Sequence, residues 1–100
     1  MALIAYSGKV SFLRVHEVSS KYGPPSDQID VEVVFQLAGV PGKSFGLQLR
    51  NDTNRLTHYG ALDLLRDAFA NGYTVMTDAD FTGTHQNAVV YVGRVAIRRP

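Results

Sequence analysis

The sequence predicts an all-β barrel with one helix, folded as a single domain over residues 1–100. Period-two alternation of apolar residues in several segments indicates strands, and one segment with a three- to four-residue repeat indicates a helix. Stretches rich in Gly, Pro, Asn and Asp separate these segments. With 45% hydrophobic and 19% charged residues, a chain of 100 residues can bury one core but is too short for a second. These observations exclude large enzyme folds and a disordered chain.

The composition narrows the classes of function. The net charge of +1 provides no strong attraction to nucleic acid or to anionic lipid. The absence of cysteine excludes a disulfide framework, an iron–sulfur cluster, a cysteine-based zinc site and a thiol nucleophile, and no cofactor is predicted. No apolar run approaches the ~18–20 residues of a membrane span, so membrane insertion is not expected. The first six residues show no leader, which leaves secretion after removal of a leader and the cytoplasm both open.

The first strand is predicted over residues 3–18, with an interruption of its alternation. Val10 and Phe12 share one parity, whereas Leu13 and Val15 share the other. A β-bulge or a bend near Gly8 accounts for such a slip and allows one strand to serve two halves of a curved sheet.

The second and third strands are predicted to form a hairpin. Apolar residues alternate with mostly polar ones over residues 29–37, after a loop at residues 22–27 that contains two prolines. A short turn at residues 38–43 leads to a second alternating segment at residues 45–49. The side chains expected on the outer face of these two strands are Asp30, Glu32, Val34, Gln36, Gly46, Gln48 and Arg50.

The periodicity changes over residues 58–71, which predicts an amphipathic helix of about four turns. Leu62, Leu65 and Phe69 are expected to face the core. Thr57 is a candidate N-terminal cap, and Gly72 supplies the left-handed residue at the end.

Two further strands follow the helix. Residues 73–77 and 88–98 read as strands, separated by a polar loop at residues 78–87. Five strands with one helix between the third and the fourth, and a long bent first strand, are the pattern of the five-stranded OB-fold barrel. An open α+β sandwich is the structural alternative.

Motifs with catalytic or metal-binding chemistry are incomplete. Residues 42–44 contain Gly-Lys-Ser, but Leu37 stands where a phosphate-binding loop needs glycine. Asp78, Asp80 and His85 lack the further ligands of a calcium loop, so no metal site is predicted. No nucleophile, base and oxyanion donor occur in a recognisable frame, and an enzyme is not expected.

Single-stranded nucleic acid is the alternative ligand, because OB-folds bind it by stacking bases on exposed aromatics in a basic groove. The outer positions of the second and third strands include two carboxylates and no aromatic side chain. Arg94, Arg98 and Arg99 cluster near the end of the last strand, which is typical of a solvated face. Nucleic acid is therefore expected less than another ligand.

The receptor-binding B subunits of AB-type bacterial toxins, particularly the Shiga-toxin type, have a central segment that resembles residues 61–75, ALDLLRDAFANGYTV. In that family a helix with the pattern Leu-x-x-Leu-Leu-x-x-Ala ends at a Gly and runs into a Thr-Val strand. The resemblance is good over 15 residues and loose over roughly 60. The chain lacks the family's disulfide and its sugar-binding tryptophan, so no individual sugar-binding residue is carried over. The resemblance implies a ring-shaped homopentamer with the helix lining a central pore and a glycan on one rim.

Two groups of residues are candidates for this function, a non-enzymatic oligomeric module that binds a glycan or a protein surface. Loops at one end of the barrel are expected to hold the ligand, since OB-folds commonly bind through them. The candidate ligand-binding residues are Tyr22, Asp80, Phe81, His85 and Gln86. The residues expected to face the pore are Asp63, Arg66 and Asp67, of which Asp63 and Arg66 can pair along the helix. A monomer with a solvated helix face is the competing interpretation.

Overall fold

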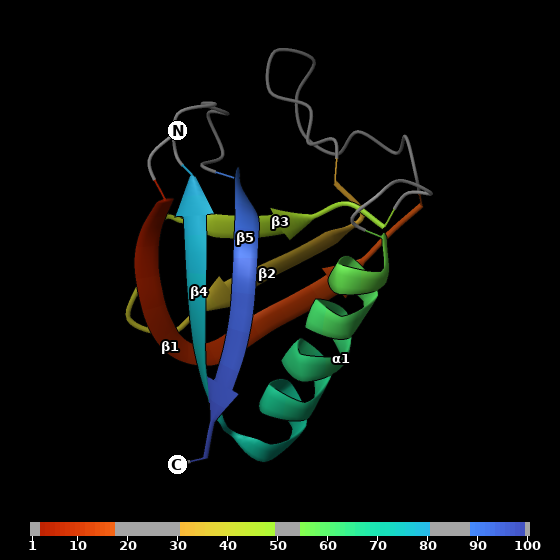
Figure 1. Cartoon of the computed structure of the whole chain (residues 1–100). Helices are drawn as coiled ribbons and strands as arrows, with labels where there is room; N and C mark the ends of the chain where they lie inside the picture. Colours follow the sequence, from red (N-terminus) through yellow and green to blue (C-terminus); the bar gives the residue numbers. More distant parts are fainter. Residues whose placement is uncertain (1–2, 18–30, 50–54, 81–88, 100) are drawn as a thin grey trace.

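Five strands and one helix follow one another in the predicted order in a computed structural model, which describes residues 3–17, 31–49, 55–80 and 89–99 (Figure 1). The helix α1 lies in the chain between the third and the fourth strands. The prediction of a mainly β domain with one helix in this position is therefore confirmed. The elements are β1 (Leu3–Val15), β2 (Val33–Leu37), β3 (Ser44–Leu47), α1 (Arg55–Asn71), β4 (Thr74–Asp80) and β5 (Val89–Arg98).

The strands are paired in the order β1-β2-β3-β5-β4, and β4 pairs in turn with β1, so the order closes on itself as a barrel. All pairs are antiparallel except that of β3 with β5, which is parallel and short. That parallel ladder joins only residues 44–46 to residues 89–91. Among the described strands, none pairs with the later part of β5 on its other side, and α1 packs there against β5 and β1.

The predicted interruption in the first strand is confirmed. The first half of β1, to Lys9, pairs with β4, whereas the half from Val10 onwards pairs with β2. Ser11 is the additional residue of a bulge, because the register shifts between Val10 and Phe12. At Gly8 a Cβ atom would lie 2.5 Å from the Ala38 carbonyl oxygen, so only glycine permits this approach of the two backbones.

The hairpin of β2 and β3 is also as predicted, although both strands are shorter. Gly39 and Gly42 in its turn have φ values of 86° and 74°, which L-residues with side chains rarely adopt. The strand β2 begins at Val33 rather than at residue 29, and residues 29 and 30 lie outside the described part of the chain.

The expected outer face of this hairpin needs two corrections. Glu32 was expected in solvent, but only 2% of it is exposed, because its Oε1 accepts a hydrogen bond of 2.8 Å from Leu49 N. Buried carboxylates are tolerated where such donors satisfy them. Val34 is 3% exposed and forms a small cluster with Val31, so its side of β2 is covered as well.

The core inside the barrel is built from two aromatic rings and several aliphatic side chains. The rings of Phe35 and Phe45 stack with their centroids 5.2 Å apart. Leu65 of α1 is fully buried against this core, so the helix covers one side of the barrel. The buried members of the core are Val10, Val33, Phe35, Leu37, Phe45, Leu47, Leu65, Ala68, Val75 and Ala79.

The helix begins earlier and faces the core differently from the prediction. It starts at Arg55, so Thr57 lies inside its first turn and is not the cap. Arg55 and Leu56 are good helix formers, which the apolar repeat does not reveal. Phe69 is 53% exposed, because Ala68 occupies the buried position and one residue further turns the side chain by about 100°.

The predicted end of the helix is confirmed. Gly72 has a φ of 70°, and its N–H donates to the Ala68 carbonyl oxygen at 2.8 Å.

The strand β4 is longer than predicted, and β5 contains an irregularity. Asp78, Ala79 and Asp80 belong to β4, whereas the sequence predicted a loop there. The register between β4 and β5 shifts where Asp78 pairs with Arg94 and Ala79 pairs with Val92, which leaves Gly93 as an additional residue. This bulge explains why Val92 and Val95 both pack against the core, although simple alternation placed them on opposite sides.

Candidate functional site

Most of the predicted ligand-binding residues lie outside the described part of the chain. These are Tyr22, Phe81, His85 and Gln86. Asp80 is the last residue of β4, where its backbone pairs with Leu3 and with Tyr91, so it belongs to a strand end rather than to a loop. The ligand site predicted from these residues therefore stays a prediction.

The helix face predicted to line a pore is exposed. Asp63, Arg66 and Asp67 all face solvent in the single chain. The expected pairing along the helix is confirmed, because Arg66 Nη1 lies 3.5 Å from Asp63 Oδ1. The two side chains are 70% and 75% exposed, so this ion pair adds little to the stability of the chain.

An open groove runs between α1 and β5 and has a volume of about 470 Å³. Its residues on the helix are Thr57, Gly60, Ala61 and Leu64, and those on the strand are Arg94 and Val95. Leu56 precedes Gly60 by four residues on the helix and is 80% exposed, which extends the apolar surface outward. We refer to this surface as the α1–β5 groove.

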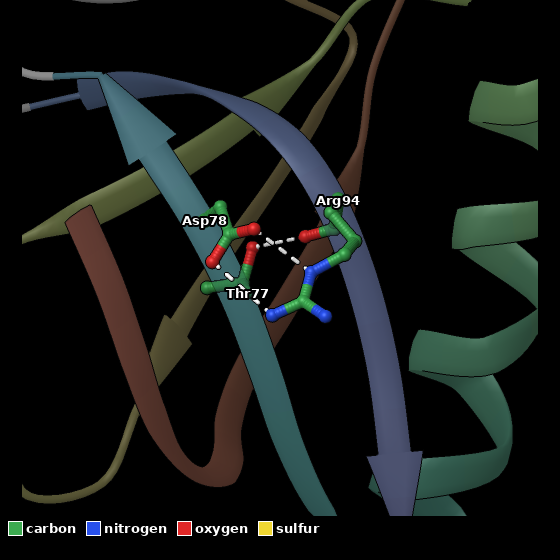
Figure 2. Close-up of polar contacts among 3 residues, drawn as sticks. All are labelled: Thr77, Asp78 and Arg94. Atoms are coloured by element: carbon green, nitrogen blue, oxygen red, sulfur yellow. Dashed lines mark hydrogen bonds and ion pairs between the residues drawn. The ribbon is translucent and has the colours of Figure 1, made fainter. Parts of the chain in front are cut away.

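The wall of the α1–β5 groove on β5 is fixed by a cluster at the bulge (Figure 2). Arg94 Nε lies 2.8 Å from Asp78 Oδ2, and Arg94 Nη2 donates to Asp78 Oδ1 at 3.2 Å. The fully buried Thr77 donates its hydroxyl proton to the Arg94 carbonyl oxygen at 2.7 Å. Because Asp78 engages the guanidinium in a two-point contact, the groove has a neutral ion pair at its edge rather than an isolated cation.

A second, smaller pocket lies beside the same groove and shares Thr57, Ala61, Arg94 and Val95 with it. His58 is held there by a hydrogen bond between its Nδ1 and the Gln48 carbonyl oxygen. The cavity also contacts Leu47, Val92 and Arg94, and its volume of about 20 Å³ matches one water molecule. It is too small for an organic ligand, so the open groove is the surface that can take a partner.

A second surface, which was not predicted from the sequence, crosses the outside of three strands. Phe12 is 38% exposed and pairs with Gln36 on β2, whose Nε2 donates to Ser44 Oγ on β3 at 3.1 Å. The Arg14 guanidinium carbon lies 5.7 Å from the centre of the Phe12 ring. We call Phe12, Gln36 and Ser44 the outer row. The signal for this position is the interruption of the alternation after Val10. If Val10 and Leu13 both face the core, Phe12 between them faces the outside of the sheet.

Neither surface resembles a catalytic or metal centre. Within residues 3–17, 31–49, 55–80 and 89–99, no group of three or more histidine, aspartate or glutamate side chains could hold a metal ion. In the same residues, no helix is both long and apolar enough to cross a membrane. The two surfaces consist of apolar, amide, hydroxyl and paired charged groups.

Comparisons of the chain with protein-family models, with curated proteins and with solved structures found no match. The geometry of the described surfaces is therefore the basis for a functional proposal.

Proposed function

We propose that the chain is an OB-fold binding module that assembles with copies of itself and binds a glycan or a protein surface without catalysing a reaction. The exposed apolar surface along the α1–β5 groove carries this proposal. Leu56 is 80% exposed beside a groove that Leu64 and Val95 line. Leu64 and Val95 are half-buried, so together with Leu56 they form a partly exposed apolar surface, which is typical of a protein contact.

The OB-fold assignment is supported by three features of the described strands. The strand β1 bends and pairs with both β2 and β4, the short parallel ladder joins β3 to β5, and α1 connects β3 to β4. This is the arrangement of a partly open five-stranded barrel. The resemblance to toxin B subunits belongs to the same proposal, since those proteins share this order of elements.

Self-association is proposed to be head-to-tail. The later part of β5 has backbone groups that no described strand pairs on one side, and α1 lies beside it with its own exposed face. One copy would place an edge or helix into the α1–β5 groove of the next, so the two contact surfaces differ. Such a contact must close by rotation into a ring or continue as a fibre. A ring of five places Asp63, Arg66 and Asp67 near its axis, where acidic and basic groups of neighbouring helices offset one another.

Light scattering across a range of protein concentrations tests the assembly. A ring of five gives a mass near five times 11.0 kDa. Gly60→Glu is the matching variant, because position 60 has open space for a side chain but lies in the groove. We expect this variant to be a folded monomer. A wild-type monomer at micromolar concentration would contradict the proposal, as would an assembly that Gly60→Glu leaves intact.

Single-stranded nucleic acid is the second candidate, and one observation favours it. Glu32 is buried and so does not lie on the outer face of the hairpin, and the exposed ring of Phe12 lies beside that face on β1. Retention on immobilised single-stranded DNA that falls steeply with salt would support this function, because neutralised phosphates release counterions. Binding to a glycan array that survives raised salt would support the first function instead.

A further inference from the structure

We propose that the outer row is the subsite for an acidic glycan, with one sugar ring on Phe12 and its acidic group between Lys9 and Arg14. This inference rests on the proposed glycan binding and gives it a location and a ligand class. The predicted loop residues do not take part in it.

The outer row combines an aromatic face with directed hydrogen-bonding groups. Phe12 and Gln36 are directly paired across β1 and β2, and the Gln36 side chain is held by its hydrogen bond of 3.1 Å to Ser44. Ser11 donates its hydroxyl proton to the Gln36 carbonyl oxygen at 3.3 Å, beside the ring. A pyranose can place its C–H face on the ring while its hydroxyls bond to the amide and hydroxyl groups.

The row is held in place before any ligand binds. The contact of Arg14 with the Phe12 ring, at 5.7 Å, is of the cation–π type and restricts the ring. The bulge at Ser11 fixes the outward direction of Phe12, because Val10 on one side of it is buried and Leu13 on the other packs against the core. Restricting these groups in advance lowers the entropy lost on binding.

The charge of this face selects an acidic ligand. The described strands β1, β2 and β3 contain two basic residues, Lys9 and Arg14, and no acidic residue. Lys9 lies opposite Ala38 and Arg14 lies opposite Val34, so the two cations flank the outer row along the strands. Lys9 and Arg14 are five positions apart, but Ser11 between them is the additional residue of the bulge. About four strand steps, or about 13 Å, therefore separate the two positions, enough for a sugar ring between them.

The same face fits a sugar better than a run of nucleotides. A single strand of nucleic acid is typically bound by stacking successive bases on several aromatic side chains. The outer row has one ring, and the positions next to it are an amide and a hydroxyl. Direct hydrogen-bonding groups beside a single ring match the alternation of apolar and hydroxyl faces on a glycan.

A glycan array tests this inference with two variants and a matched control. The array contains sialylated, uronate-containing and sulfated oligosaccharides beside their neutral counterparts. Phe12→Leu keeps an apolar side chain but removes the ring, and we expect binding to acidic glycans to fall about tenfold. Lys9→Gln should reduce the preference for acidic over neutral glycans by about threefold. Phe69→Leu changes an exposed ring on α1, 53% exposed, and should leave binding unchanged.

Each outcome separates the inference from the proposed function. Glycan binding that Phe12→Leu and Gln36→Ala both leave unchanged, with unaltered melting temperatures, overturns the outer row but keeps the function. Absence of binding to every glycan overturns this inference and the glycan part of the proposed function, whereas assembly through the α1–β5 groove is tested separately by light scattering. Binding to single-stranded DNA that Phe12→Leu weakens would assign the outer row to nucleic acid instead. A preference for neutral glycans would refute the acidic class.

Discussion

At the scale of single residues, the contribution of a side chain to stability depends on how far it is buried. Two apolar residues one turn apart on the helix differ most clearly. Leu65 is completely buried, whereas Phe69, one turn later, is 53% exposed although it is the larger apolar residue. The hydrophobic repeat of the sequence cannot distinguish them, because both fall on the same side within the tolerance of a 3.6-residue period.

We expect Leu65→Ala to lower the free energy of unfolding by about 2–5 kcal/mol, because it removes buried methyl groups and leaves a cavity. Phe69→Ala, as the control, should change it by less than about 0.5 kcal/mol. Urea denaturation of both variants measures the difference. Equal effects of the two substitutions would mean that the helix is rotated from the described orientation.

A second prediction concerns the buried hydroxyl at the β5 bulge. Thr77→Val preserves shape but removes the donor to the Arg94 carbonyl oxygen, so the free energy of unfolding should fall by about 1 kcal/mol. Thr74→Val, earlier on the same strand, is the control and should change little. An effect of Thr77→Val no larger than that of its control would show that the hydrogen bond does not stabilise the bulge.

At the scale of elements, the sequence predicts existence and order better than boundaries. Five strands, the helix, the bulge after Val10 and the helix end at Gly72 could all be predicted, because alternation and glycine positions report backbone geometry directly. The buried position of Glu32 could not, because it depends on the distant Leu49 N–H. The outer row and the α1–β5 groove bring together residues from different elements, so neither has a pattern within one segment.

The bend of β1 provides a prediction at this scale. Gly8→Ala should destabilise the chain, because its Cβ would lie 2.5 Å from the Ala38 carbonyl oxygen. Gly60→Ala has no atom within 4 Å of the new Cβ and should instead stabilise the helix by about 0.5–1 kcal/mol. Thermal unfolding of the two variants gives opposite shifts in Tm if β1 and α1 are as described. A tolerated Gly8→Ala would mean that β1 and the turn after β2 are further apart.

At the scale of the whole molecule, stability and assembly are linked. An assembled state that unfolds to separate chains gains stability with concentration by mass action. We therefore expect the Tm of the wild-type protein to rise as its concentration is raised, and the Tm of Gly60→Glu to stay constant. Calorimetry over a hundredfold range of concentration measures both. A wild-type Tm that does not depend on concentration would speak against a ring held by the α1–β5 groove.

The parallel ladder between β3 and β5 has a consequence for the order in which the protein folds during synthesis. The ladders β1–β2, β2–β3 and β1–β4 can form once β4 has left the ribosome, but β3 and β4 each keep one edge without a partner until β5, the last strand in chain order, arrives. The ladder between β1 and β4 also joins residues that are far apart in sequence, such as Ile4 and Ala79. Such contacts slow folding, and open strand edges promote aggregation while they persist. The nascent chain therefore depends on its final strand, and a translational pause before residue 89 would prolong the period in which it is exposed to aggregation.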